Sequence, residues 1–144
     1  MNFLGRFSDP IYCLMRLFAG LMFACHGASK LLGWFPNPKQ PAPAHALDTM
    51  TMISGGIELV GGLLIAIGLL TTIAAFLASG LMAVAYFMVH AQMGSPIPYV
   101  NKGELAVLYC FVFLYICARG PGPWSIDALM RRAPVTNDNT VITR

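Results

Sequence analysis

Six ionisable side chains lie within long apolar stretches of this sequence. They are Arg16, His26, Lys30, Glu58, His90 and Glu104. If these stretches cross a membrane, each charge costs at least about 2.5 kcal/mol on insertion scales, so such residues face the protein interior and pair there. Carboxylate and imidazole groups that lie together can hydrogen-bond a polar head group and exchange protons with it. The set therefore predicts a site for proton exchange or for head-group binding.

The stretches themselves are apolar enough to span a bilayer. The chain has 144 residues, of which 57% are hydrophobic and only 10% charged, whereas a soluble domain carries about 25% charged residues. A span needs about 20 residues, and the four runs cover about 11–32, 50–70, 71–93 and 100–118. The net charge of +3 forms no basic stripe, which excludes a nucleic-acid-binding protein.

The segments between the runs predict how the spans are connected. The first link contains four prolines within residues 36–43, which favour an extended loop. The second and third runs meet at Thr71 and Thr72, which can cap a new helix, so a tight hairpin is expected there. After the fourth run, Ser125 could cap a short amphipathic helix over 126–132.

The distribution of basic residues predicts the orientation. The side that holds both termini carries Arg6, Arg119, Arg131, Arg132 and Arg144. The other side carries Lys39 and Lys102, with Lys30 at its border. Because the cytoplasmic loops of membrane proteins carry an excess of basic residues, both termini are expected to be cytoplasmic. The expected fold is all-α: an integral-membrane, antiparallel four-helix bundle forming one domain over 1–132, followed by a disordered polar tail over 133–144.

An up-and-down path through the membrane brings most of the ionisable residues to one depth. Glu58 lies about eight residues into its span, or roughly 12 Å, and His90 lies near the end of the next span. The candidate proton-exchanging residues are Glu58, His26 and His90, and the candidate binding residues are Lys30, Glu104, Tyr86 and Arg16. Arg16 falls in the opposite half of the membrane, where backbone carbonyls or a lipid phosphate are its expected partners.

Simpler interpretations of the same residues stay open. A structural ion-pair network could pin the four helices together, and Lys30 and Glu104 could snorkel to the interface. Glu58 is too short to snorkel, so it needs a partner such as Lys30 or His26, or a raised pKa. A metal site lacks the usual short His and Glu spacings. A haem held between His26 and His90 is a further alternative.

The chain resembles the DoxX family of small bacterial membrane proteins in an ordered set of motifs between about residues 14 and 129. The motifs are Arg16-Leu17, His26-Gly27-x-x-Lys30-x-x-Gly33-Trp34-Phe35, Gly56-x-Glu58-x-x-Gly61-Gly62, Gly68-Leu69, His90, Gly103-Glu104, and Gly120-Pro121-Gly122-Pro123-Trp124-Ser125-x-Asp127. This resemblance implies four spans and a bacterial inner-membrane location. It also implies a link to oxidoreduction, since related proteins are described as subunits of quinone-reducing thiosulfate oxidation or as partners of redox-defence enzymes. The proline-rich loop 36–43 looks like an insertion.

The function that these observations favour is a membrane subunit of a quinone-linked oxidoreductase or respiratory system. The sequence has no dinucleotide-binding motif, cysteine cluster or haem signature. An electron carrier must then come from a partner, a membrane or periplasmic redox protein, or quinone itself is the only redox species and the candidate cofactor. The chain is not expected to be a complete enzyme alone. The alternatives are a non-catalytic structural or assembly subunit of a larger membrane complex, and a transporter of protons or small solutes.

Overall fold

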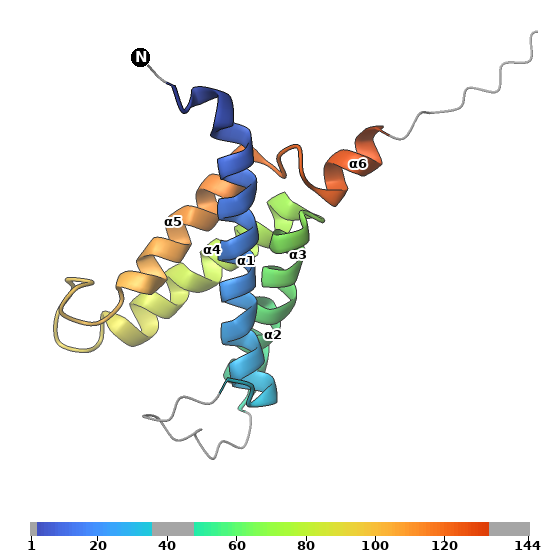
Figure 1. The fold of residues 1–144 in the computed structure, drawn as a ribbon. Helices are drawn as coiled ribbons and strands as arrows, with labels where there is room; N and C mark the ends of the chain where they lie inside the picture. Colours follow the sequence, from blue (N-terminus) through green and yellow to red (C-terminus); the bar gives the residue numbers. More distant parts are fainter. Residues whose placement is uncertain (1–2, 36–47, 133–144) are drawn as a thin grey trace, which may run out of the picture.

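The structure is a computed structural model that describes residues 3–35 and 48–132, and these residues form helices and turns without a strand (Figure 1). The helices are η1 (Gly5–Phe7), α1 (Ser8–Leu32), α2 (Thr49–Gly56), η2 (Ile57–Gly61), α3 (Gly62–Ile67), α4 (Thr71–Ala85), η3 (Tyr86–His90), α5 (Glu104–Arg119) and α6 (Ile126–Arg132). Both η2 and η3 are π-helical and continue their neighbours without a break. The predicted loop at 36–43 and tail at 133–144 lie outside the described residues.

Three continuous helical segments are long and apolar enough to cross a membrane: Gly5–Leu32, Thr49–Ile67 and Thr71–His90. The fourth, α5, has 16 residues. At 1.5 Å per residue it is about 24 Å long, less than the roughly 30 Å of a hydrocarbon core. It begins at Glu104, later than the expected start near residue 100, because residues 97–103 form turns in which Gly103 N donates to Pro98 O over 2.9 Å.

The first helical pair consists of α1 packed against the continuous α2–η2–α3 helix. Glycines allow the two backbones to touch. A Cβ atom on Gly20 would lie 2.6 Å from Gly62 O, and one on Gly27 would lie 2.3 Å from Leu59 N. A larger residue at either position would force the helices apart. Close packing through small residues is the usual way to associate helices in lipid, and it fixes α1 relative to η2.

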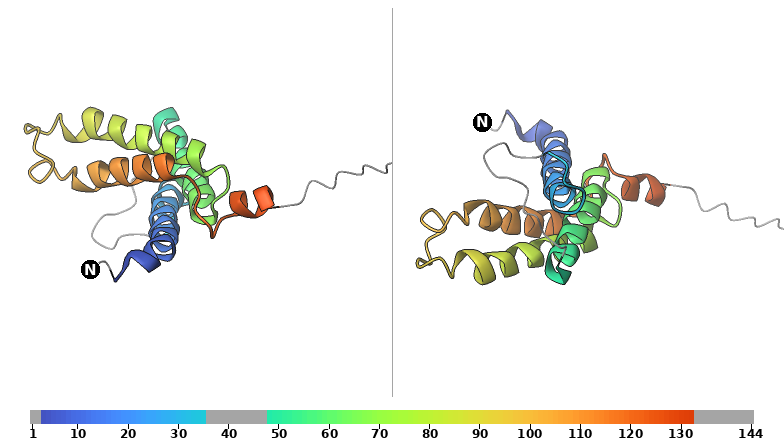
Figure 2. Two further views of the ribbon diagram at one scale, coloured as in Figure 1. Left: turned by 90° about the horizontal axis from the view of Figure 1, so that it is seen from above. Right: turned by 90° about the horizontal axis from the view of Figure 1, so that it is seen from below.

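The second helical pair is the antiparallel hairpin of α4 and α5, which pack closely against each other. Its interface with the first pair is closed by fully buried side chains that include Phe23, Phe113 and Ile116. The two pairs cross obliquely: seen from above, α1 is viewed nearly end-on while α4 and α5 lie lengthwise (Figure 2). The pairs are joined tightly, because only residues 68–70 separate α3 from α4.

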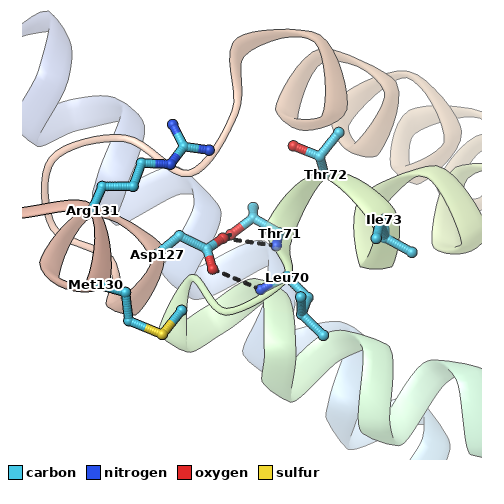
Figure 3. A pocket seen from close by; sticks show the side chains of 7 residues that line it. All are labelled: Leu70, Thr71, Thr72, Ile73, Asp127, Met130 and Arg131. Atoms are coloured by element: carbon cyan, nitrogen blue, oxygen red, sulfur yellow. Dashed lines mark hydrogen bonds between the residues drawn. The ribbon is translucent and has the colours of Figure 1, made fainter. Parts of the chain in front are cut away.

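The start of α4 is capped by a residue distant in sequence rather than by Thr71 or Thr72 as expected (Figure 3). Asp127 of α6 accepts hydrogen bonds from Leu70 N at 2.9 Å and from Thr71 N and Oγ1, both at 3.0 Å. Asp127 N donates to Gly68 O at 2.9 Å. One carboxylate therefore satisfies the first amides of α4 and ties α6 to the hairpin.

The same contacts set the charge state of Asp127. Partial burial acts to raise the pKa of this carboxyl, but the hydrogen bonds from Thr71 and Leu70 and the nearby charge of Arg131 outweigh burial and hold the pKa below its usual range. Helix α6 itself begins where the sequence predicts, with Ala128 N donating to Ser125 Oγ at 3.1 Å. Asp127 is thus the anionic partner of a helix N-terminus, an arrangement that the helix dipole favours.

Candidate functional site

Glu58 is one of the most buried charged residues in the described chain, with 2% of its surface exposed. Its Oε1 accepts a hydrogen bond from Lys30 Nζ at 2.6 Å, which forms an ion pair between η2 and the last turn of α1. The Lys30 side chain is 42% exposed and the Glu58 side chain 3%, so the pair joins a partly exposed ammonium group to a buried carboxylate. Lys30 was one of the two partners expected for Glu58, and the structure selects it over His26.

A cavity of about 230 Å³ opens beside this ion pair, between the two helical pairs. Its polar lining residues are His26, Lys30, Glu58, His90, Lys102 and Tyr109. The remaining walls are apolar and come from α1, α4 and α5. Four residues expected at one depth, namely Glu58, both histidines and Lys30, therefore surround one cavity. What they do there stays a prediction.

Both π-helical segments carry a residue of this cavity. Glu58 lies in η2 and His90 is the last residue of η3. A π-turn inserts an extra residue into an α-helix and changes the direction of the side chains around it, and such turns are frequent at functional sites. Hydrophobic periodicity contains no signal for them, so the sequence did not predict that Glu58 and His90 would be presented in this way.

The orientation of His90 is fixed by the loop that follows it. Its Nδ1 lies 3.1 Å from Asn101 O, and its ring stacks against Tyr86 at 6.4 Å. Because a carbonyl oxygen can only accept, Nδ1 carries the hydrogen and Nε2 of the neutral ring is left as an acceptor. Asn101 is buried and holds the loop through Ser95 O at 2.9 Å and Gly103 N at 2.9 Å. Asn101 was not predicted as a positioning residue from the sequence.

His26 and Tyr109 also line the cavity and contact each other. The His26 imidazole meets the Tyr109 ring edge-on, with centroids 6.2 Å apart. Tyr109 also stacks on Phe113 at 5.3 Å and contacts Phe23 at 5.5 Å, which fixes its ring in the core. Tyr109 is not among the site residues predicted from the sequence. It falls within the fourth apolar run, where a tyrosine is the type of residue that brings a hydroxyl group into an apolar interior.

Two residues of the predicted binding set lie near the cavity but do not line it. The Tyr86 hydroxyl donates to Pro96 O at 2.5 Å, and its ring lines a separate apolar groove between α4 and α5. Glu104 is exposed in the first turn of α5. Lys102, which was used only to predict the orientation in the membrane, lies in the lining instead. Residues 97–103 form turns rather than a helix, and this brings Lys102 to the cavity.

Arg16, the last member of that set, lies far along α1 from the cavity and is buried, with 2% of its surface exposed. Its Nη1 donates to Ile65 O and, at 2.9 Å, to Ala66 O, while its Nη2 donates to Trp124 O at 2.6 Å. Backbone carbonyls were among its expected partners. We call this arrangement the Arg16 clamp, because it ties α1 to the end of α3 and to the segment before α6.

Comparison with known proteins places these features in a family context. The family model described as DoxX matches residues 11–91. One protein of Haemophilus influenzae, described as uncharacterized, is 38% identical over 129 residues, covering 88% of this chain and 96% of the relative. A second protein from the same organism, also described as uncharacterized, is 28% identical over 128 residues and covers 83% of this chain and 82% of its own length. No solved structure matches the chain.

Proposed function

Because the chain belongs to the DoxX family, we propose that it is a multi-pass inner-membrane protein whose cavity binds the head group of a quinone for a partner redox protein. In this proposal α1, α2–α3, α4 and α5 form a four-span bundle with both termini in the cytoplasm. The short α5 spans with the help of its flanking turns or in a locally thinned bilayer. The cavity then opens in the outer half of the membrane, within reach of lipid-soluble molecules.

The single observation that carries this proposal is the composition of the cavity wall. One carboxylate, two imidazoles, two ammonium groups and a phenol surround about 230 Å³ within apolar helices. Pockets that enclose a whole drug-sized ligand measure about 300–1,000 Å³. The smaller volume suits a single polar ring whose apolar tail stays in lipid. Ammonium and imidazole groups supply hydrogen-bond donors for ring oxygens.

The same side chains are suited to move protons. Reduction of a quinone by two electrons takes up two protons, and the reverse reaction releases them. His26 is exposed toward the cavity rim, and His90 has Nε2 available as an acceptor. Imidazole is the side chain that most readily gains and loses a proton near neutral pH. The two electrons are supplied or removed by a redox protein that binds beside this chain.

The ion pair also supports a second candidate, a structural subunit without a ligand. The 2.6 Å contact between Lys30 and Glu58 joins α1 to η2, and such a pair could serve only to fix the helices in an assembly. The two candidate functions differ in whether they require the two histidines. A scaffold does not require the imidazoles of His26 and His90, whereas a binding cavity does.

Binding of decylubiquinone to the full chain in lipid nanodiscs tests the proposal. We expect saturable binding by the wild type and at least tenfold weaker binding by the His26→Leu/His90→Leu double variant, which removes hydrogen-bonding groups worth at least about 1.4 kcal/mol together. Glu104→Gln is the matched control, because Glu104 lies near the cavity but outside its lining, and it should bind like the wild type. Absence of saturable binding to the wild type, or equal binding by the double variant, would leave the structural subunit as the better explanation.

A further inference from the structure

Two buried polar atoms in the cavity wall have no hydrogen-bond partner among the described residues: Glu58 Oε2 and the Tyr109 hydroxyl. Only 2% of Glu58 and 6% of Tyr109 is exposed. Buried polar atoms are almost always hydrogen-bonded, and each exception calls for an explanation. Glu58 and Tyr109 belong to different helical pairs, and both residues line the same cavity, so a ligand that enters the cavity lies beside both of them.

The chemistry of the two atoms differs. Glu58 is paired with the Lys30 ammonium through Oε1, so its carboxyl group is ionised and Oε2 can only accept a hydrogen bond. The Tyr109 hydroxyl can donate and accept. The other polar groups of the lining, namely the two ammonium groups and the two imidazoles, can all act as donors. Among the described residues that line the cavity, Glu58 thus supplies the one anionic acceptor, while the other polar groups can act as donors.

A quinone and its reduced form differ in what they offer to this acceptor. Both ring oxygens of a quinone are carbonyl groups, which only accept, so Glu58 Oε2 gains no bond from it. Both oxygens of a quinol are hydroxyl groups, which can donate to Glu58 and still accept from Tyr109, Lys30 or Lys102. The reduced form therefore makes at least one more hydrogen bond, and that bond is charge-assisted and buried, the class of hydrogen bond that is strongest.

We propose that the cavity binds the quinol in preference to the quinone, with Glu58 Oε2 accepting from one quinol hydroxyl and the Tyr109 hydroxyl serving as a second anchor. This inference rests on the proposed function, since it assumes a quinone-type head group. Beyond that function, the site selects one redox form of the ligand, and Tyr109 has a role in binding it.

Potentiometric titration of decylubiquinone bound to the full chain in nanodiscs tests the preference. Tighter binding of the reduced form raises the midpoint potential of the bound couple, by about 30 mV for each tenfold difference in affinity. We expect a rise of at least about 30 mV over the couple in protein-free nanodiscs. In Glu58→Gln the acceptor loses its charge, and the rise in midpoint potential should fall below half of the wild-type rise. A wild-type potential at or below that of protein-free nanodiscs would overturn the preference.

Two tyrosine variants test the second anchor. Tyr109→Phe removes only a hydroxyl group and should weaken quinol binding about three- to tenfold, the value of one hydrogen bond. Tyr115→Phe is the matched control on the same helix, since the Tyr115 hydroxyl accepts from Arg119 at 3.0 Å and lies outside the cavity lining. If Tyr109→Phe and Tyr115→Phe both bind like the wild type, Tyr109 is not an anchor. Failure of the wild type to bind either redox form would instead reject the proposed function itself.

Discussion

Among the described residues, a buried charged side chain lies toward each end of the helical pairs, and the two differ in their hydrogen bonding. Arg16 and Glu58 have the same exposed fraction, 2%. Arg16 donates three hydrogen bonds to backbone carbonyls of α3 and of the segment before α6, and only its Nε has no partner in the described chain. Glu58 has one ion pair with Lys30, leaves Oε2 without a partner in the described chain, and borders a cavity.

This difference indicates that Arg16 serves to stabilise the fold, whereas Glu58 is suited to bind a ligand. A buried charge whose hydrogen-bonding groups are mostly satisfied by the backbone holds helices together and has little capacity left for a ligand. A buried charge with a free acceptor beside a cavity keeps that capacity, at a cost in free energy to the folded protein. The Arg16 end also contains the Asp127 cap, so the connections between α3, α4 and α6 are concentrated there. The Lys30–Glu58 end is left open to a ligand.

The largest expected effect is loss of the Arg16 clamp. Arg16→Met should lower the free energy of unfolding by about 3–5 kcal/mol, because it removes three hydrogen bonds from a charged donor and leaves buried carbonyls unpaired. Unfolding in mixed detergent micelles measures the change. Arg6→Met is the control, since Arg6 is exposed, and it should change stability by less than about 0.5 kcal/mol. Similar losses from both variants would mean that the clamp contributes nothing specific.

A smaller effect is expected from the Asp127 cap. Asp127→Ala should cost about 0.5–2 kcal/mol at pH 7, the usual value of an N-cap. Because the pKa of Asp127 is lowered in the folded protein, its contribution is fully present above the unfolded pKa of about 3.9. The contribution is lost as pH falls through the lower, folded pKa. The stability difference between wild type and Asp127→Ala should therefore stay constant from pH 7 to 5 and shrink below about pH 4. A difference that grows on acidification would contradict this assignment.

The sequence predicts the helices better than their ends. The apolar runs and the absence of a long link before Thr71 were sufficient to predict three long helices and a tight hairpin, and Ser125 marked the start of α6. Polar groups that act across long sequence distances were not predictable. Asp127 caps α4 from a separate helix, so the expected caps at Thr71 and Thr72 were wrong. The predicted start of α5 near residue 100 was also wrong. Apolar side chains continue before Glu104 in residues that form turns, so hydrophobicity alone does not mark the start of the helix.

The candidate site shows the same limit. Depth along an antiparallel chain was enough to place Lys30, Glu58 and His90 toward one end. Their helical phase was not enough to separate Tyr86, whose hydroxyl binds Pro96 O, from residues that line the cavity. A π-turn shifts the phase of the residues around it, and a period of 3.6 residues takes no account of this. Tyr109 was missed because one tyrosine in an apolar run carries no spacing signal.

The smallest expected effect on stability comes from removing both members of the Lys30–Glu58 pair. In Lys30→Met/Glu58→Met no charge is stranded, the side-chain volumes are similar, and the desolvation cost of Glu58 disappears, so the free energy of unfolding should change by less than about 1 kcal/mol. The midpoint-potential shift of bound decylubiquinone should nevertheless be lost, since the acceptor is gone. Unfolding and potentiometric titration of the same preparation measure both. If the double variant is destabilised as much as Arg16→Met, the pair pins helices in the manner of the clamp, and the contrast between a stabilising end and a binding end does not hold.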